Sequence, residues 1–353
     1  MHVTLLVPDI HDRPTGGNIY NRRVIAGLRR RGPVDVVPWA PEDADVPGLD
    51  RPDEGVIVVD SLLLRHEDPL RTLRWAHPAA TIVLLAHYLH CIDPNEWDTP
   101  AADTERAVLP LVDGAVTTSR SARRAMAEVG LPEHRIAVVP PGVDDAYRAP
   151  VPDRSERSGP PRLLTVASLL PGKGLPALVD GLRTLADLDW TWTLVGDDTL
   201  APAFADALRD QVRSAAVADR MTLAGTVPSG EMRAQYDEAD VFVLPSRFET
   251  CSMATREAMA RGLPVVAYEV GGLPDNFGNA SGPSTALAGR LVPPDRPNAL
   301  TDALRDLLTD SARRTRMGQA ARERSRAFPT WDAVAKALLT TLKSLSALGA
   351  RFR

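Results

Sequence analysis

One stretch, residues 241–267, constrains the fold more than any other part of the sequence. It begins with four apolar residues typical of a buried strand, Val241–Leu244, and ends with a second such run, Leu263–Ala267. Between these runs, Ser252 is placed to cap a short helix and Gly262 to end it. A strand, a helix and a second strand in this order predict part of a parallel sheet that is covered by helices.

Two glutamates flank the start of the predicted helix. Glu249 lies in the loop before it, and Glu257 lies just past its first turn. A helix N-terminus attracts anions because its first amide groups have no partner within the helix and the helix dipole is positive there. A phosphate held by these amides would have a carboxylate on either side. The alternative is a solvated surface helix, and the placement of the pair around an anion-binding terminus favours a functional site.

The same stretch resembles the signature of the family 4 retaining glycosyltransferases with the GT-B fold. The resemblance lies in two glutamates with seven residues between them, Glu249 and Glu257, and in the run 257–266, which reads E-A-M-A-R-G-L-P-V-V. It implies an α/β protein with two Rossmann-like doubly wound domains that face a deep cleft. It also implies that Glu249 contacts the sugar hydroxyls of a nucleotide-diphosphate sugar and acts in catalysis, and that Glu257 contacts the ribose.

Length and composition are those of a globular protein with more than one domain. The 353 residues suggest two domains, and 44% hydrophobic and 25% charged residues are ordinary values. A formal net charge of −5 argues against a nucleic-acid-binding protein. The two cysteines, Cys91 and Cys251, have no metal-binding spacing, and with no secretory signal they predict a cytoplasmic location. The longest apolar run, Thr81–Ala86, is too short to span a bilayer, so at most peripheral membrane contact is expected.

The first half of the chain alternates predicted strands and helices. The predicted strands are Met1–Val7, Val34–Val37, Val56–Val59, Thr81–Ala86, Val116–Thr118 and Ile136–Val139. This alternation predicts a doubly wound parallel sheet, which binds ligands beyond the carboxyl ends of its strands. Residues 1–150 are expected to form a domain around this sheet, and the family resemblance implies that this domain binds the acceptor. Residues 151–161 are rich in Pro, Ser and Arg and are expected to form a linker.

The turn after the first strand contains Gly16 and Gly17, where backbone amides can approach a ligand closely. It lacks the third glycine of the dinucleotide fingerprint, which argues against a nicotinamide cofactor. The family resemblance places both glycines beside the donor phosphates and the acceptor. The neighbouring residues Asn18, Tyr20 and Asn21 are predicted on the acceptor side.

Two histidines follow the predicted strand Thr81–Ala86. His87 comes directly after it, and a single histidine in such a place is more often structural than catalytic. The resemblance implies that His87 contacts the transferred sugar and acts in catalysis, and the alternative, His90, is assigned to the acceptor side. The other histidines form no cluster with metal-binding spacing.

The pattern restarts at Arg162, and residues 162–328 are predicted to form the nucleotide-sugar-binding domain. The loop after its first strand contains Lys173 and Gly174. Arginine is abundant in this chain, but lysine occurs only at positions 173, 336 and 343, which favours a specific use for a compact cation in this loop. A lysine there can neutralise the charge on a departing pyrophosphate. The resemblance assigns this donor-binding and catalytic role to Lys173, with Gly174 beside it.

The sequence departs from the family pattern at three positions. The family has an arginine five residues before the lysine, where this chain has Ser168, and Arg247 is the predicted replacement. The family also favours glycine at the positions of Thr250 and Ser252, so the sugar pocket is expected to differ from that of relatives. The predicted donor-binding residues of this loop and helix are Arg247, Glu249, Thr250, Cys251, Ser252, Met253 and Glu257.

Two further features complete the sequence-based interpretation. Asp197 and Asp198 resemble an acidic metal-binding pair and are interpreted as the start of a helix, since the chemistry of the family needs no bound divalent cation. Residues 329–353 are expected to form a last helix, with Val334, Leu338 and Leu342 on one apolar stripe. The family resemblance implies that this helix crosses back to the first domain.

The resemblance therefore implies a retaining hexosyltransferase with no tightly bound cofactor and no required metal. Its co-substrate is a nucleotide-diphosphate sugar, and its acceptor is a small molecule or a lipid-linked molecule. The alternatives are a nucleotide-sugar epimerase, a phosphorylase, a glycosidase and a non-catalytic nucleotide-sugar-binding protein. A glycosidase would need two carboxylates close to one glycosidic bond, whereas Glu249 and Glu257 are placed around a phosphate site.

Overall fold

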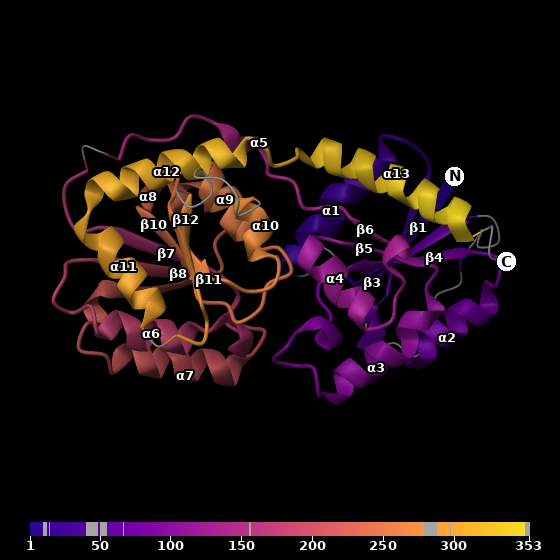
Figure 1. Cartoon of the computed structure of the whole chain (residues 1–353), viewed down its shortest axis with the longest axis horizontal. Helices are drawn as coiled ribbons and strands as arrows, with labels where there is room; N and C mark the ends of the chain where they lie inside the picture. Colours follow the sequence, from indigo (N-terminus) through magenta and orange to yellow (C-terminus); the bar gives the residue numbers. More distant parts are fainter. Residues whose placement is uncertain are drawn as a thin grey trace. The chain divides into compact units, whose positions relative to one another are not determined.

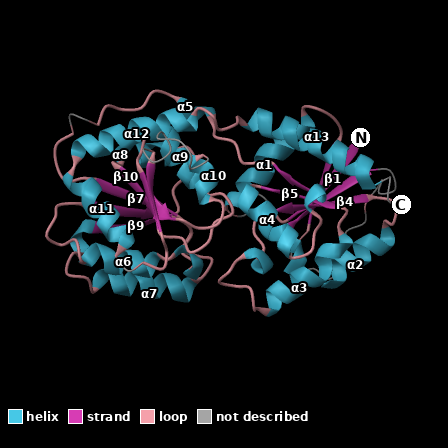
Figure 2. Cartoon of the chain, in the orientation of Figure 1, coloured by secondary structure: helices cyan, strands magenta, loops and turns pink. Residues whose placement is uncertain are grey.

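The protein is described by a computed structural model that covers residues 1–9, 13, 15–39, 49, 55–65, 67–154, 157–278, 288–296 and 298–349. The chain divides into two compact units, residues 1–142 together with 329–353, and residues 143–328 (Figure 1). Among the described residues, each unit contains one six-stranded sheet. Figure 2 shows the strands of each unit lying between layers of helices, which is the Rossmann-like arrangement predicted from the sequence. Among the described residues, no helix is long and apolar enough to cross a membrane.

The first unit contains a parallel sheet with strand order β2-β1-β3-β4-β5-β6. Its strands are β1 (His2–Val7), β2 (Val34–Pro38), β3 (Gly55–Asp60), β4 (Thr81–Ala86), β5 (Gly114–Thr117) and β6 (Ile136–Val138). Its α-helices are α1 (Gly16–Arg29), α2 (Glu67–Ala76), α3 (Pro100–Val108), α4 (Arg120–Glu128) and α13 (Trp331–Gly349). Its short 3-10 helices are η1 (Ser61–Arg65), η2 (His90–Ile92), η3 (Leu109–Leu111) and η4 (Glu133–Arg135). All six strands predicted in this half of the chain are therefore present.

Helix α13 packs on the first unit, although it is the last helix in the sequence. Its apolar stripe, Val334, Leu338 and Leu342, is buried in the same core as β1 and β4. Gly27 of α1 allows the two helices to approach, because a Cβ atom at Gly27 would lie 2.3 Å from the Cβ of Ala335. The C-terminal helix is thus part of the core of the first unit.

The second unit contains a parallel sheet with strand order β12-β11-β10-β7-β8-β9. Its strands are β7 (Arg162–Val166), β8 (Thr191–Val195), β9 (Met221–Gly225), β10 (Val241–Leu244), β11 (Val265–Tyr268) and β12 (Gly289–Val292). Its α-helices are α5 (Asp145–Arg148), α6 (Leu175–Arg183), α7 (Pro202–Arg213), α8 (Met232–Glu238), α9 (Met253–Ala260), α10 (Leu273–Phe277), α11 (Ala299–Thr309) and α12 (Ser311–Ser325), and its 3-10 helices are η5 (Pro171–Lys173) and η6 (Ala218–Arg220). Strand β12 was not predicted, because its glycine and arginine hide the apolar pattern.

The predicted helix start at Asp197 and Asp198 is wrong. Helix α7 begins at Pro202, a residue that favours the first turn of a helix because it has no N–H to leave unpaired. Asp197 instead closes a turn, since its carboxylate accepts hydrogen bonds from the backbone N–H and the hydroxyl of Thr199 at 2.8 and 2.7 Å. Asp198 forms an ion pair with Arg209 of α7.

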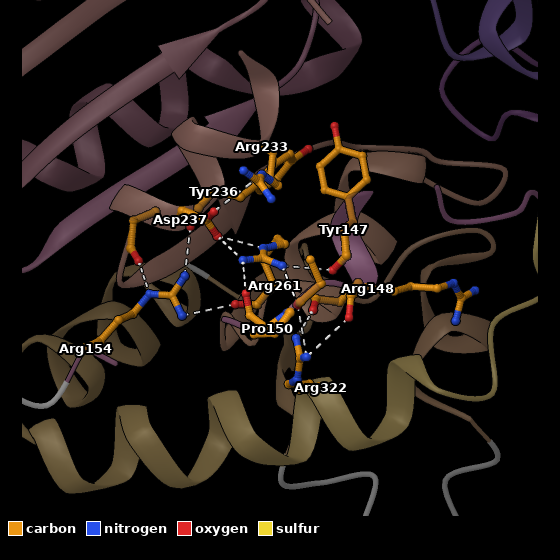
Figure 3. A network of polar contacts seen from close by, with 12 residues as sticks. Tyr147, Arg148, Pro150, Arg154, Arg233, Tyr236, Asp237, Arg261 and Arg322 are labelled. Carbon is orange, nitrogen blue, oxygen red and sulfur yellow. Dashed lines mark hydrogen bonds and ion pairs between the residues drawn. The ribbon is translucent and has the colours of Figure 1, made fainter. Parts of the chain in front are cut away.

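A buried arginine holds residues 143–154 against the rest of the second unit (Figure 3). Arg261, at the C-terminus of α9, is 1% exposed and forms an ion pair with Asp237 at 2.6 Å. Its guanidinium also donates hydrogen bonds to the backbone carbonyls of Tyr147, Ala149 and Pro150. Since a buried cation needs partners for its N–H groups, these carbonyls hold both the arginine and the segment in place.

Arg154 makes the complementary contacts from the segment to the unit. Its guanidinium donates to the backbone carbonyls of Tyr236, Ala239 and Arg261 at 2.7 to 3.0 Å. Burial, and then the neighbouring charge of Arg157, lowers the pKa of Arg154 to about 10. The residue stays protonated at neutral pH, so the carbonyls at the ends of α8 and α9 keep a cationic partner.

The N-terminal part of the first unit ends at Gly142, whereas the sequence predicts a first domain that ends at residue 150. The difference has a physical reason, because Val143 and Tyr147 are buried in the core of the second unit. Of the expected linker 151–161, Ser155 and Glu156 lie outside the described residues, and Arg154 is held by the second unit as described above.

Candidate functional site

The loops that follow β7 and β10 lie side by side at the carboxyl edge of the second sheet. The N–H of Arg247 donates a hydrogen bond to the carbonyl of Gly172 at 2.9 Å. Gly174 has a φ of 65°, and a Cβ atom there would lie 2.0 Å from the carbonyl oxygen of Pro245. Only glycine allows this approach, which brings Lys173 against the loop that carries Glu249.

Lys173 and Glu249 form an ion pair in this place. The Lys173 Nζ atom lies 2.7 Å from Glu249 Oε1, and the two side chains are 27% and 12% exposed. The backbone of Glu249 is also held, because its carbonyl accepts a hydrogen bond from Gly272 at 2.7 Å. Gly271, with a φ of 51°, allows this contact, since a Cβ atom there would lie 2.1 Å from the Glu249 carbonyl oxygen. Two predicted site residues that are 76 positions apart in the sequence are thus brought together.

Helix α9 begins as predicted, with Ser252 as its N-cap. The Ser252 hydroxyl accepts a hydrogen bond from the N–H of Thr255 at 3.3 Å. Ser252 also has a φ of 62°, a conformation that is strained for residues with a side chain. This strain gives a physical reason for the family's preference for glycine here. Gly262, with a φ of 70°, ends the helix as predicted.

Glu257 of α9 has a buried tyrosine as its partner. The hydroxyl of Tyr236 donates a hydrogen bond to Glu257 Oε2 at 2.8 Å. Burial, and then the negative charge of Glu257, raises the pKa of Tyr236 well above its ordinary value, so the hydroxyl keeps its proton. Sequence reasoning missed Tyr236, since an aromatic residue on an amphipathic helix is usually part of the core.

Asn276 of α10 holds the backbone between the two glutamates. Its side-chain amide donates to the carbonyl of Cys251 at 2.5 Å, and its oxygen accepts from the Nε atom of Arg256 at 2.8 Å. Arg256 in turn lies over the ring of Phe328, 4.7 Å from the ring centre. Burial raises the pKa of Cys251, so this residue is a thiol. Asn276 and Arg256 were both missed by sequence reasoning.

The remaining predicted donor-side residues differ in exposure. Arg247 is exposed, and Thr250 and Met253 are half-buried on either side of the strained turn at Ser252. All of them lie in the loop after β10 or in the first residue of α9. The structure therefore gathers Lys173, Gly174 and the predicted residues from Arg247 onward at one edge of one sheet.

In the first unit, His87 lies at the carboxyl end of β4 and contacts two other polar side chains. Its Nε2 atom lies 2.8 Å from Asn21 Oδ1, and Asn21 Nδ2 donates to Asp60 Oδ2 at 2.6 Å. Burial lowers the pKa of His87, and the nearby Asp60 carboxylate opposes this in part. Asp60 was missed, although an acidic residue at the end of an apolar strand is a recognisable signal at the ligand-binding edge of such a sheet.

Gly17 is beside His87, while Gly16 is exposed. A Cβ atom at Gly17 would lie 3.2 Å from His87 Cδ2, whereas nothing lies within 4 Å of a Cβ atom at Gly16. Pro14, which precedes this turn, is outside the described residues. Asn18 closes the turn, since its side-chain amide donates to the carbonyl of Arg13 at 3.0 Å.

Tyr20 and His90 have different surroundings from one another. Tyr20 is 1% exposed, its hydroxyl donates to the carbonyl of Val139 at 3.0 Å, and its ring lies edge-on to His87. His90 lies 2.9 Å from the buried carboxylate of Glu105 on α3. The structure therefore joins Asn21, Tyr20 and Gly17 to His87, and places His90 with a separate partner. Among the described residues, no group of three or more His, Cys, Asp or Glu side chains is arranged to hold a metal ion.

Two family models match this chain. One, described as "Glycosyl transferases group 1", matches residues 151–324, and the other, described as "Glycosyltransferase Family 4", matches residues 74–147. A D-inositol 3-phosphate glycosyltransferase from Kineococcus radiotolerans is 36% identical over 258 residues, which cover 67% of this chain and 58% of that relative. The match thus covers less than two thirds of the relative's own length.

Solved structures share the fold. Sucrose-phosphate synthase from Thermosynechococcus elongatus has a TM-score of 0.79 at 22% identity, with 99% of this chain and 100% of that chain covered. HepE from Anabaena, in complex with UDP-glucose, has a TM-score of 0.76 at 17% identity, with 98% and 100% covered. These likenesses confirm the predicted fold class, two Rossmann-like units of the GT-B type.

Proposed function

Because this chain belongs to the family 4 glycosyltransferases, we propose that it transfers a sugar from a nucleoside-diphosphate sugar to a hydroxyl group of an acceptor. The observation that carries the proposal is the 2.7 Å contact between Lys173 and Glu249. It places a cation and a carboxylate at the edge of the second sheet where doubly wound proteins bind their ligands.

The second unit binds the donor in this proposal. Lys173 stabilises the charge that develops on the departing diphosphate, and the amides at the N-terminus of α9, beside Ser252, bind the same group. Glu249 binds the hydroxyls of the sugar, and Glu257 those of the ribose. The support is the position of both glutamates at the edge that carries Lys173, with Glu257 oriented by Tyr236.

The first unit contributes His87 and the acceptor side. His87 contacts the transferred sugar, and Gly17 leaves room for a ligand next to its ring. Since Tyr20 and Asn21 are buried against His87, their role is to support it. The acceptor is a small hydroxylated molecule or a lipid-linked one, and the former is supported by the inositol phosphate in the name of the Kineococcus radiotolerans relative.

Two finer features belong to the same proposal. The sugar keeps its anomeric configuration, which is supported by the resemblance to the retaining enzymes, and no metal is required, since Lys173 supplies the positive charge that a metal would otherwise provide. A cytoplasmic location is supported by Cys91 and Cys251, both of which are unpaired and buried. Analysis of the product by NMR, and turnover measured with a chelator, test the first two points.

Calorimetric titration with a panel of nucleoside diphosphates tests donor binding. One base is expected to bind, and its sugar derivatives are then incubated with the protein and analysed for hydrolysis and transfer. A protein that binds none of the panel contradicts the proposal. Binding without hydrolysis or transfer of any sugar would instead identify a non-catalytic nucleotide-sugar-binding protein.

Arg247 is proposed to share the phosphate load that an arginine at the position of Ser168 carries elsewhere in the family. Its exposed side chain, and the bond from its N–H to the lysine loop at Gly172, support this role. Arg247→Ala is expected to weaken the affinity for the donor by about tenfold, the effect of losing one charge-assisted hydrogen bond. An unchanged dissociation constant would exclude the role.

A further inference from the structure

Three side chains at the carboxyl edge of the first sheet form a connected network, which we name the His87 network: Asp60, Asn21 and His87. They come from the end of β3, from α1 and from the residue after β4. Asp60 is 1% exposed, Asn21 is 0% exposed and the His87 side chain is 12% exposed. Buried polar groups in direct contact fix one another's hydrogen-bond directions.

The direction of these hydrogen bonds follows from Asp60. One carboxylate oxygen accepts from the N–H of Leu62 at 2.9 Å, and the other lies 2.6 Å from the side-chain nitrogen of Asn21. A carboxylate only accepts, so the amide N–H₂ of Asn21 faces Asp60 and its oxygen faces His87. That oxygen lies 2.8 Å from His87 Nε2 and also only accepts. The His87 Nε2 atom must therefore carry the proton.

The ring is held in this state by its surroundings. Burial lowers the pKa of His87 below its ordinary value of 6.5, so the imidazole is neutral at neutral pH. The backbone N–H of His87 donates to Ser61 Oγ at 3.2 Å, and the ring of Tyr20 lies 5.1 Å away, edge-on. The charged group beside the ring is the Asp60 carboxylate, whose Oδ2 atom lies 3.6 Å from His87 Nε2. With Nε2 protonated and the ring neutral, Nδ1 carries the lone pair.

We propose that Asp60 and Asn21 are positioning residues that hold His87 as the neutral Nε2–H tautomer, so that its Nδ1 atom accepts a hydrogen bond from a substrate hydroxyl. The substrate part of this inference rests on the proposed function. The network selects for a ligand group that donates a hydrogen bond, such as a sugar hydroxyl, and against a group that only accepts, such as a carbonyl or phosphate oxygen. Discrimination of this kind arises because a mismatched buried group loses its partner.

The tautomer is measured directly by NMR of the full chain labelled with ¹⁵N-histidine. The His87→Gln variant identifies the His87 signals among those of the seven histidines. The wild-type protein at neutral pH is expected to show a protonated Nε2 and an unprotonated Nδ1. A protonated Nδ1, or a charged ring at neutral pH, would overturn the proposal.

Two substitutions of Asp60 test the role of the network. Asp60→Asn introduces a donor that conflicts with the N–H of Leu62 or with the amide of Asn21, so Asn21 is expected to turn and the Nδ1–H tautomer to appear. Asp60→Ala frees Asn21 and is expected to give both tautomers. Transfer should fall about tenfold to a hundredfold in kcat, the range seen when the partner that orients a ligating histidine is removed, while KM for the donor changes little.

Thr117→Val is the matched control. Thr117 is buried, pairs with Ala86 in the register of β4 and β5, and its hydroxyl has no hydrogen-bond partner among the described residues. Since valine has the same shape, this variant should keep the wild-type tautomer and wild-type transfer. If either Asp60 variant is folded and its His87 keeps the Nε2–H tautomer, the network does not set the tautomer and the inference is wrong.

The failure of the inference and the failure of the proposed function are distinguishable. If the Asp60 variants change the tautomer but the wild-type protein transfers no sugar, the network stands and the proposed function fails. If wild-type transfer is normal and the tautomer does not depend on Asp60, the proposed function stands and the inference about the network fails. A tautomer change with unaltered kcat would show that His87 does not act through Nδ1, which contradicts the substrate part of the inference.

Discussion

The polar groups of the two units are held in different ways. In the first unit, His87 contacts Asn21, and Asn21 contacts Asp60. Asp60 and His87 lie at strand ends, Asn21 lies within α1, and all three are largely buried. In the second unit, Lys173 ends the short 3-10 helix η5 and Glu249 lies in the loop after β10. Both are partly exposed, and they form an ion pair. The first arrangement is fixed by packing before any ligand arrives. In the proposed function, a diphosphate would compete with Glu249 for the lysine of the second arrangement.

Substitutions in the two units should therefore act in different ways. A change in the His87 network alters the direction of hydrogen bonds inside a core, so its effect passes through orientation and protonation. A change at Lys173 alters the charge available to a ligand. Under the proposed function, its effect should be largest in the transition state, where the charge of the leaving group develops. Four measurements, given in order of the size of the expected effect, test this difference between the units.

Lys173→Ala should have the largest effect. Turnover should fall by roughly two to three orders of magnitude, the scale of losing one transition-state contact. Lys336→Ala removes an exposed lysine of α13 and serves as the control with unchanged turnover. Near-normal turnover in Lys173→Ala would show that this residue of the second unit does not act in the chemistry, which contradicts the contrast between the units.

Tyr236→Phe should have a smaller effect, on donor binding. It deletes the hydroxyl that donates to Glu257 and keeps the buried ring. Loss of one such hydrogen bond costs about 1 kcal/mol, so the donor dissociation constant should rise by roughly fivefold. In a double-mutant cycle with Glu257→Gln the two effects should be non-additive. Full additivity would mean that Tyr236 supports the fold and does not orient Glu257.

The free energy of unfolding should depend on pH through His87 of the first unit. Because the folded pKa of His87 lies below 6.5, the unfolded chain takes up a proton at a higher pH than the folded chain does. Stability from this group is therefore complete above pH 6.5 and falls as the pH drops toward the folded pKa, by at most about 1.4 kcal/mol per pH unit. Urea unfolding at several pH values should show this slope in the wild type and less of it in His87→Gln. Equal slopes would show that His87 charges freely in the folded state.

Ser252→Gly should have the smallest effect. Glycine relieves the positive φ and loses only a few tenths of a kcal/mol of capping, so the free energy of unfolding should rise by about 0.5 kcal/mol. Ser252→Ala keeps the strain and loses the cap, and should lower the free energy of unfolding by about 1 kcal/mol. If both variants are destabilised equally, the backbone at Ser252 is not strained.

The sequence predicted the fold well because the strands are continuous apolar runs. It missed β12, whose four residues begin with glycine and arginine. It predicted roles for Lys173, Glu249, Glu257 and His87 through a family resemblance and through their places at strand ends and a helix start, and these roles stay predictions.

The partners of these residues were harder to predict. Tyr236 meets Glu257 only because α8 packs beside α9, and Asn276 reaches Cys251 across 25 positions. Asp60 lies 3.6 Å from His87 Nε2 and is also joined to it through Asn21, and the three residues come from different parts of the chain. Such partners are set by the packing of elements against one another, which a local sequence pattern does not encode.

The arginine contacts of the segment 143–154 have a practical consequence for engineering. A fragment of the second unit that started at residue 151 would lack the carbonyls of Tyr147, Ala149 and Pro150 and would leave the guanidinium of Arg261 buried with fewer acceptors. A fragment from Val143 to Phe328 keeps them, together with the bond from Arg148 to the carbonyl of Phe328 at 2.9 Å. Expression of the second unit alone, and domain exchanges with relatives, should therefore join the chain before Val143.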